Sequence, residues 1–286
     1  MKRLIVLLGV AGVSLSAILV RWSTAPSLIL VLYRVGMAAL LLAPAVLFRY
    51  REEWKGLTYR EALLCIASGA FLGLHFTAYF AALDLTSIAS AVVLVDTEVL
   101  FVALATVLVL GRKLSRQAWI AVLLAFGGSM LVAAGDISVS AKALWGDMIA
   151  LAGALCMAVY TMIGTVCRRR LTTTVYTFLV YAAAAVTVLV IALVQGLPLT
   201  GYGPINYATA FGMAVFCTLL GHSVFSWGLK YLPPAFIATV KLLEPVFAAL
   251  WGLALFAEVP GWTVILGGAV VIGGVALYSH AADDET

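Results

Sequence analysis

The chain has 286 residues, of which 64% are hydrophobic and only 10% are charged, and its formal net charge is +4. A soluble domain of this size needs far more polar surface, so the composition excludes an ordinary soluble protein. A membrane β-barrel is excluded too, because its segments alternate over about 10 residues, whereas the apolar runs here are continuous and about twice as long. We therefore expect an all-α polytopic membrane protein, in which the basic loop residues set topology rather than bind nucleic acid.

Ten apolar spans follow one another along the chain and predict ten transmembrane helices. Their approximate limits are 4–22, 27–48, 62–83, 88–110, 117–134, 145–167, 173–195, 207–229, 234–256 and 261–279. The start resembles a signal peptide, but the apolar run of 17 residues (Leu4–Val20) is long for one and belongs to the repeat described below, so we expect a retained helix. Only the connections 49–61 and 196–206 are much longer than a tight turn, and the polar tail 281–286 is expected to be disordered.

Loop charge predicts the orientation, because basic residues accumulate in cytoplasmic loops. With the N-terminus in the cytoplasm, thirteen basic loop residues fall on the cytoplasmic side, and only Arg21 and Lys142 fall outside. The thirteen are Lys2, Arg3, Arg49, Arg51, Lys55, Arg60, Arg112, Lys113, Arg116, Arg168, Arg169, Arg170 and Lys230. We expect a multi-pass protein of the cytoplasmic (inner) membrane with both termini in the cytoplasm, as a monomer or homodimer.

The four cysteines give no sign of a metal site or a disulfide framework. Cys65, Cys156, Cys167 and Cys217 lie within or at the ends of apolar runs, without CxxC spacing and without a histidine cluster. We interpret them as small buried apolar side chains and expect neither metal nor cofactor.

An internal repeat is the most informative pattern in the sequence. A shift of 146 residues places 83–131 on 229–277 without a gap, with Glu98 on Glu244 and Gly127-Gly128 on Gly273-Gly274. Each half, 1–138 and 139–286, then holds five spans, and an odd number turns the second half upside down relative to the first. Inverted repeats of this kind are typical of secondary carriers, whose substrate sites lie near mid-membrane between the halves.

The ninth predicted span carries charge where hydrocarbon is expected. Lys241 and Glu244 stand near its middle, and a charge at a helix centre costs at least ~2.5–3.5 kcal/mol. Three positions apart, the two side chains should share one helix face. Pro245 has no N–H for the carbonyl of Lys241, so we expect a kink there, with Pro233, Pro234 and Pro245 as hinge candidates.

The fourth span carries Asp96 and Glu98, which diverge by roughly 200° on a helix, so we expect only one of them to face a central path. Glu98 is preferred because the repeat places it on Glu244, whereas Asp96 is expected to meet Lys241 or Arg34. A carboxyl group alone in hydrocarbon takes up a proton, while one beside a lysine stays ionised. Static ion pairs and substrate or proton binding both stay open, with Glu98, Glu244 and Asp96 as proton-coupling candidates.

Five further polar or aromatic residues within the spans are candidates for substrate binding. Arg34 either extends outward to the interface or anchors a substrate carboxylate. His75 and His222 lie one residue apart in the repeat register and either shuttle protons or make static hydrogen bonds. Tyr79 and Trp227 lie near the same level, where aromatic rings would line a pocket or simply fill the core.

Several motifs resemble one known family. They are Leu243-Glu244-Pro245-Val-Phe-Ala-Ala-Leu with Leu255-Phe-Ala-Glu258, the glycines 267–268 and 273–274, Trp145-Gly-Asp147, and Leu32-Tyr-Arg34-Val-Gly-Met-Ala-Ala-Leu. Together they resemble the drug/metabolite transporter superfamily in its ten-span EamA-type branch, over almost the whole chain. The resemblance implies that spans 1–4 and 6–9 surround a central path while spans 5 and 10 are peripheral packing helices. Val99, Arg112, Asp96 and Lys241 depart from the family pattern.

The leading hypothesis is a secondary transporter of small polar or amphipathic metabolites, with amino-acid-like solutes favoured, working in export or exchange. Mixed charge around Lys241 suits a zwitterion or an organic anion better than a lipophilic cation. A proton-coupled multidrug exporter is the alternative. An intramembrane enzyme is disfavoured because the sequence has no HExxH, GxSxG or paired-aspartate array, and a channel would require a ring-like filter of identical segments.

Overall fold

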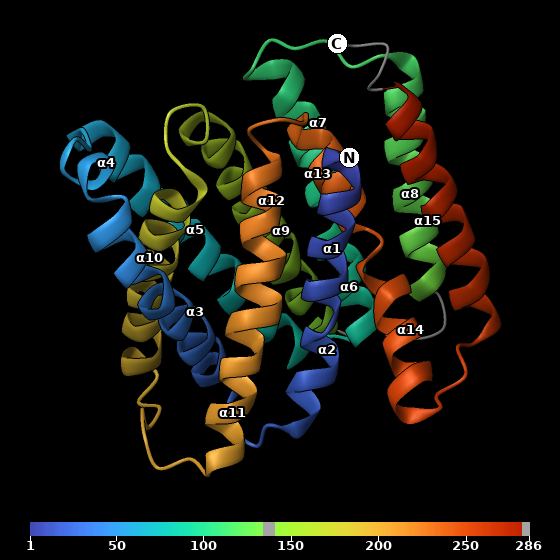
Figure 1. Cartoon of the computed structure of the whole chain (residues 1–286). Helices are drawn as coiled ribbons and strands as arrows, with labels where there is room; N and C mark the ends of the chain where they lie inside the picture. The colour runs from blue at the N-terminus through green and yellow to red at the C-terminus, as the bar shows by residue number, and fades with distance from the viewer. Residues whose placement is uncertain (134–140, 282–286) are drawn as a thin grey trace. The chain divides into compact units, whose positions relative to one another are not determined.

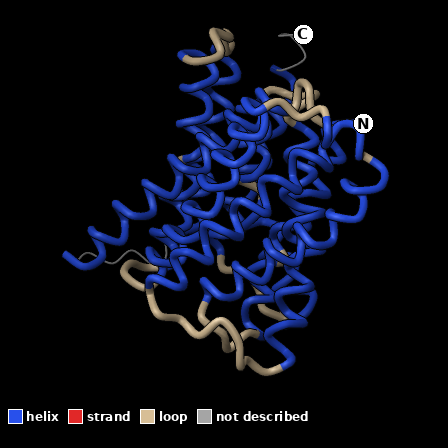
Figure 2. Tube along the Cα trace, turned by 90° about the vertical axis from the view of Figure 1, so that its left-hand side faces the viewer, coloured by secondary structure: helices blue, strands red, loops and turns tan. Residues whose placement is uncertain are grey.

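The structure, a computed structural model, describes residues 1–133 and 141–281. Within these ranges the chain forms helices joined by turns and loops, with no strand (Figure 2), so the all-α prediction is confirmed for the described part of the chain. The expected boundary of the two halves at 138/139 and the tail beyond Ala281 lie outside the described residues.

The helices are labelled in Figure 1. In the first half they are α1 (Lys2–Ser14), α2 (Ser16–Leu19), η1 (Val20–Trp22), α3 (Ser27–Pro44), η2 (Ala45–Arg49), α4 (Arg51–Lys55), α5 (Tyr59–Leu83), α6 (Ile88–Asp96), α7 (Glu98–Leu108) and α8 (Arg116–Ala133). In the second half they are α9 (Ala141–Cys167), α10 (Thr173–Val194), α11 (Pro204–Gly212), η3 (Met213–His222), α12 (Ser223–Gly228), α13 (Pro234–Lys241), α14 (Glu244–Phe256) and α15 (Trp262–Ala281).

Nine helical segments among the described residues are long and apolar enough to cross a bilayer. They are Ser27–Arg49, Tyr59–Leu83, Ser90–Leu108, Arg116–Ala133, Ala141–Cys167, Thr173–Val194, Pro204–Gly228, Pro234–Phe256 and Trp262–Ala281. Each coincides with one of the ten predicted spans, because a continuous apolar run of this length satisfies its backbone in lipid only as a helix.

The first predicted span, 4–22, is the exception. It consists of α1, α2 and the 3-10 helix η1, and it is not among the nine segments. The hydroxyl of Ser14 donates a hydrogen bond to the carbonyl of Ala11 at 2.9 Å, and back-bonding of this kind bends helices. The count of ten spans therefore stays a prediction.

The chain divides into two compact units, and each draws on both halves of the sequence. The first unit comprises 1–77 and 159–230. In it α3 packs on α10, and α1 packs against η3 and α12. The approach of α1 to η3 is close, since a Cβ atom on Gly12 would stand 2.6 Å from the carbonyl oxygen of Phe216.

The second unit comprises 78–158 and 231–286, and α8 and α15 pair within it along their length (Figure 1, light green and red). A Cβ atom on Gly128 would lie 2.8 Å from the carbonyl oxygen of Gly267, and one on Gly274 would lie 2.6 Å from the nitrogen of Ala125. The glycines of the fifth and tenth spans therefore allow close helix packing. A Cβ atom on Gly273 would have no described atom within 4 Å, so this glycine takes no part in the contact.

Two spans of the second unit are interrupted at equivalent positions. The fourth stops at Asp96 and resumes at Glu98 as α7, and the ninth stops at Lys241 and resumes at Glu244 as α14. The repeat shift of 146 places the two resumption points on each other. At the ninth span Pro245 withholds an N–H, which agrees with the expected kink. At the fourth span the Thr97 hydroxyl donates a hydrogen bond to the carbonyl oxygen of Leu94 at 2.5 Å. This interruption therefore forms without a proline.

Candidate functional site

The interruptions explain why charged residues are tolerated at these positions. Glu98 and Glu244 lie in the first turns of α7 and α14, where the helix dipole favours negative charge. Lys241 lies in the last turn of α13, where the dipole favours positive charge. The break in the ninth span also corrects one prediction: Lys241 and Glu244 belong to separate helical segments, so the shared face of a continuous helix does not apply to them.

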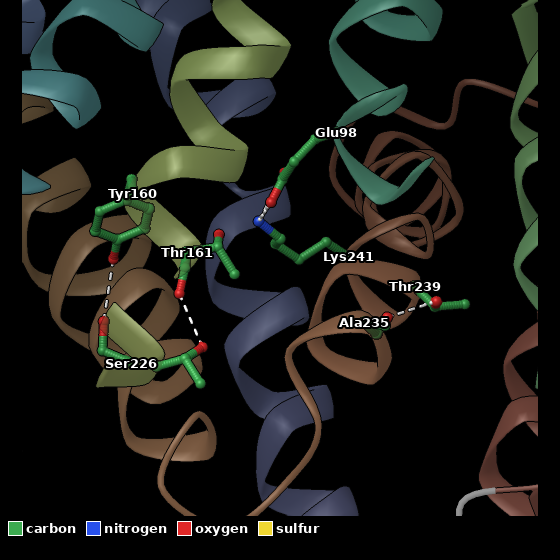
Figure 3. Close-up of polar contacts among 8 residues, drawn as sticks. Glu98, Tyr160, Thr161, Ser226, Ala235, Thr239 and Lys241 are labelled. Atoms are coloured by element: carbon green, nitrogen blue, oxygen red, sulfur yellow. Dashed lines mark hydrogen bonds and ion pairs between the residues drawn. The ribbon is translucent and has the colours of Figure 1, made fainter. Parts of the chain in front are cut away.

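Glu98 and Lys241 form an ion pair within the second unit (Figure 3). The Lys241 ammonium donates to both carboxylate oxygens of Glu98, at 2.7 and 2.8 Å. The side chains are 12% and 10% exposed, for lysine and glutamate respectively, so solvent screens the pair weakly. The prediction that Glu98, rather than Asp96, faces a central path stays a prediction.

Asp96 has a different partner from those predicted. It accepts a hydrogen bond from the hydroxyl of Ser129 on α8, rather than pairing with Lys241. The physical reason is their spacing, because residues two positions apart point to different sides of a helical segment and so meet different neighbouring helices. Asp96 nevertheless lies within electrostatic range of Glu98, Glu244 and Lys241. We call these four residues the charge cluster.

Tyr79 borders the charge cluster. It lies within electrostatic range of Glu244 and Asp96, and it packs on a small core of Ala82, Ala91 and Ala150. The cluster thus joins three carboxyl groups to one ammonium group beside a phenol. Such a set can bind an ammonium group or a proton, and Lys241 can exchange its carboxylate partner.

Arg34 occupies the interior of the first unit. Its side chain is buried, its Nε–H donates to the hydroxyl oxygen of Thr218 at 2.8 Å, and its guanidinium lies 4.9 Å from the centre of the Phe76 ring. An arginine that extends to the interface would be exposed, so that interpretation of Arg34 is wrong for this structure. The second interpretation, an anchor for a carboxylate, stays a prediction.

Both histidines lie beside Phe76. The rings of His75 and His222 have their centres 5.3 and 5.5 Å from that of Phe76, and both residues are buried. The first unit therefore gathers Arg34, His75 and His222 around one aromatic ring. Trp227, on α12, is half-buried.

The sequence model of the EamA-like transporter family matches the chain twice, over residues 2–134 and 144–280. The chain belongs to the EamA-like transporter family. Its predicted resemblance to the EamA-type branch of the drug/metabolite transporter superfamily is thereby confirmed, and the protein is a multi-pass membrane transporter. The lipid bilayer and a transported substrate follow as its partners.

Similar proteins support the family and the fold. Two proteins of Archaeoglobus fulgidus, each named an uncharacterized transporter, are similar to the chain. One is 27% identical over 202 residues, which is 69% of each chain; the other is 32% identical over 72 residues, which is 25% of this chain and 27% of the relative. A crystal structure with 17% identity covers 99% of this chain and 98% of its own, with a TM-score of 0.83, and shows the shared fold.

The prolines of this EamA-like transporter stand at helix starts. Pro233 precedes α13, Pro234 lies in its first turn, and Pro245 lies in the first turn of α14. Proline fits the first turn because the N–H it lacks would have no intrahelical partner there. Their role as hinges stays a prediction.

Sequence reasoning missed the hydroxyl partners and misjudged Arg168. Counted above among the loop charges, Arg168 is 2% exposed. Its guanidinium donates to the carbonyl of Ser226 at 3.0 Å, to the hydroxyl of Thr173 at 2.7 Å and to the carbonyl of Leu171. The Ser226 hydroxyl also bonds that of Tyr160 at 3.0 Å (Figure 3), so α9 and the turn that follows it are each joined to α12. A run of three arginines in the sequence does not indicate which of them is buried, whereas Ser129 is recognisable as the hydroxyl residue within the apolar part of α8.

In the described part of the chain, no group of three or more histidine, cysteine, aspartate or glutamate side chains is arranged so that it could hold a metal ion.

Proposed function

We propose that this EamA-like transporter moves small polar or amphipathic metabolites, with amino-acid-like solutes favoured, by alternating access in export or exchange. The observation that carries the proposal is the buried Glu98–Lys241 ion pair at the break of two spans. Broken transmembrane helices are the usual construction of a carrier's binding site. A zwitterion supplies a carboxylate for Lys241 and an ammonium group for the carboxyl groups that remain.

The proposed architecture is ten spans in two inverted five-helix repeats, 1–138 and 139–286. Three observations support it. The family model matches once in each half. Equivalent spans pack in pairs, as α3 with α10, α7 with α13, and α8 with α15. The interrupted spans resume at Glu98 and Glu244, which the repeat places on each other.

In the proposed mechanism Lys241 exchanges its partner during transport. In the empty carrier Lys241 is paired with Glu98. The carboxylate of an arriving solute then binds Lys241 in place of Glu98, and the ammonium group of the solute binds a carboxylate of the charge cluster. Segments α13 and α14 would move about Pro233, Pro234 and Pro245. Substrate contacts are proposed for Arg34, His75, Tyr79, Glu98, His222, Trp227, Lys241 and Glu244.

Proton coupling is a further part of the proposal, with Glu98, Glu244 and Asp96 as carriers. The excess of carboxyl groups over ammonium groups in the charge cluster supports it, because a proton would satisfy the carboxyl left without a cation when Lys241 turns to a solute. We also propose the cytoplasmic membrane as location, with both termini in the cytoplasm, as a monomer or homodimer.

The same excess of carboxyl groups favours a second candidate, a proton-coupled multidrug exporter, since organic cations would bind there. Lys241 opposes it, because a second cation beside the lysine is repelled. Resistance to cationic dyes on overexpression that disappears with Glu98→Gln would favour the exporter. Absence of such resistance would favour the metabolite transporter.

Counterflow in proteoliposomes tests the proposal. Vesicles loaded with one solute of a panel of amino acids, organic anions, nucleobases and cations are diluted into labelled solute, with and without a pH gradient. Saturable counterflow of an amino-acid-like solute is expected, and Lys241→Ala and Glu244→Gln should abolish or strongly reduce it. Unchanged transport in both variants would remove the charge cluster from the mechanism.

A further inference from the structure

The eighth span of the first unit contains a π-helix. Segment η3 runs from Met213 to His222, between α11 and α12. Such helices close their hydrogen bonds over five residues, occur mostly as single turns and are frequent at functional sites. Here the Ser223 N–H bonds the carbonyl of Thr218, five residues back. The wider turn changes the directions of Thr218 and His222 from those of an α-helix.

The backbone carbonyl of Thr218 is held by hydrogen bonds from two side-chain hydroxyls. Its carbonyl accepts a hydrogen bond from the Tyr181 hydroxyl at 3.1 Å and another from the Ser223 hydroxyl at 3.3 Å, and these two hydroxyls lie 2.9 Å apart. Tyr181 and Thr218 are 0% and 1% exposed. The backbone that carries the Thr218 side chain is thus held in place by α10 and α12.

The hydroxyl oxygen of Thr218 accepts a hydrogen bond from the Nε–H of Arg34 at 2.8 Å. A guanidinium has five N–H donors in one plane, so a bond at Nε sets the direction of the other four. The centre of the Phe76 ring, 4.9 Å from Cζ of Arg34, gives the guanidinium a second contact. Together the two contacts orient the edge that binds a carboxylate in a bidentate manner.

We propose that Thr218 is a positioning residue, which holds Arg34 over Phe76 so that Arg34 binds the carboxylate of the transported solute. This inference rests on the proposed function and adds to it a partner for the solute carboxylate within the first unit, beside the one proposed in the second unit, Lys241. The ligand carboxylate competes for the terminal N–H groups of Arg34, while the bond at Nε stays in place.

Three variants separate this role from a structural one. Thr218→Val removes the hydroxyl at constant shape, and Thr218→Ser keeps it. Thr209→Val is the matched control: Thr209 lies in the same span and is buried, and its hydroxyl oxygen has no hydrogen-bond partner in the described part of the chain. The protected Nε–H signal of Arg34, assigned through its loss in Arg34→Lys, reports the contact by NMR without any solute. Counterflow of an amino acid, compared with that of its amide, reports whether the Thr218–Arg34 contact serves to bind the solute carboxylate.

Thr218→Val should lose the Nε–H signal and raise KM for the amino acid about tenfold with kcat retained, the size of one hydrogen bond to a charged group. KM for the amide should change less than twofold, and Thr218→Ser and Thr209→Val should match the unmodified protein. An unchanged KM in Thr218→Val, with transport intact, would overturn this inference alone. Absence of counterflow for every solute in the unmodified protein would overturn the proposed function and the ligand role of Arg34 with it.

Discussion

Removing one member of the Glu98–Lys241 pair should destabilise the protein more than removing both. At 2.7 Å and an effective dielectric constant of about 20, the gross attraction is about 6 kcal/mol, and the desolvation of two nearly buried groups offsets part of it. Lys241→Met alone leaves a buried carboxylate and should cost about 3–5 kcal/mol. Glu98→Gln alone leaves the Lys241 ammonium with the amide oxygen of the new glutamine as an acceptor. Its loss of stability should therefore be smaller than that of Lys241→Met.

The double variant Glu98→Gln/Lys241→Met therefore isolates the interaction. We expect a coupling energy of about 2–4 kcal/mol from unfolding in detergent with increasing denaturant. The exposed pair Arg51–Glu52, at 3.8 Å and with side chains 62% and 90% exposed, provides the control, and its coupling should stay below about 1 kcal/mol. Additive effects at Glu98 and Lys241, within about 0.5 kcal/mol, would refute the reasoning.

Three further predictions follow from packing and backbone. Gly128→Leu should destabilise the α8–α15 pair by about 1–3 kcal/mol, while Gly127→Leu, where a Cβ meets nothing within 4 Å among the described residues, should be neutral; thermal unfolding compares them. Arg168→Ala leaves two carbonyls and a hydroxyl without their donor and should lower stability by at least ~3 kcal/mol, whereas the exposed Arg169→Ala should change it by less than about 0.5 kcal/mol in the same denaturant series. Pro245→Ala restores an N–H beside the break and should slow counterflow without lowering the melting temperature; an unchanged rate would argue against a hinge at this proline.

Hydropathy predicted most helix limits, because the length of an apolar run and the need to satisfy its backbone in lipid leave one solution. It did not predict where helices break. The interruption at Thr97 arises from a side-chain hydroxyl that takes a backbone carbonyl, and the division of the first span follows a similar bond at Ser14. The apolar composition of a span does not reveal where a side-chain hydroxyl binds a backbone carbonyl in this way. Of these breaks, the one beside Pro245 was predictable from the sequence.

The charged residues were predicted as a group, but their pairing was not. The repeat indicated Glu98 as the more important carboxylate of the fourth span. The partner of Lys241, however, depends on which helices pack together, and Asp96 is bound by the hydroxyl of Ser129 on α8. Arg34 was identified as a buried-charge candidate, whereas Thr218, 184 positions away, carries no pattern of its own. Long-range contacts of this kind are determined by packing, which one sequence does not specify.

Ligand-induced stabilisation tests the central claim most directly. A bound solute raises the free energy of unfolding by RT ln(1 + [L]/Kd), so the purified protein should melt at a higher temperature with a solute that it also exchanges in proteoliposomes. The Glu98→Gln/Lys241→Met variant, measured from its own baseline, should lose this increment for that solute. An equal increment in the variant would contradict binding at the Glu98–Lys241 pair.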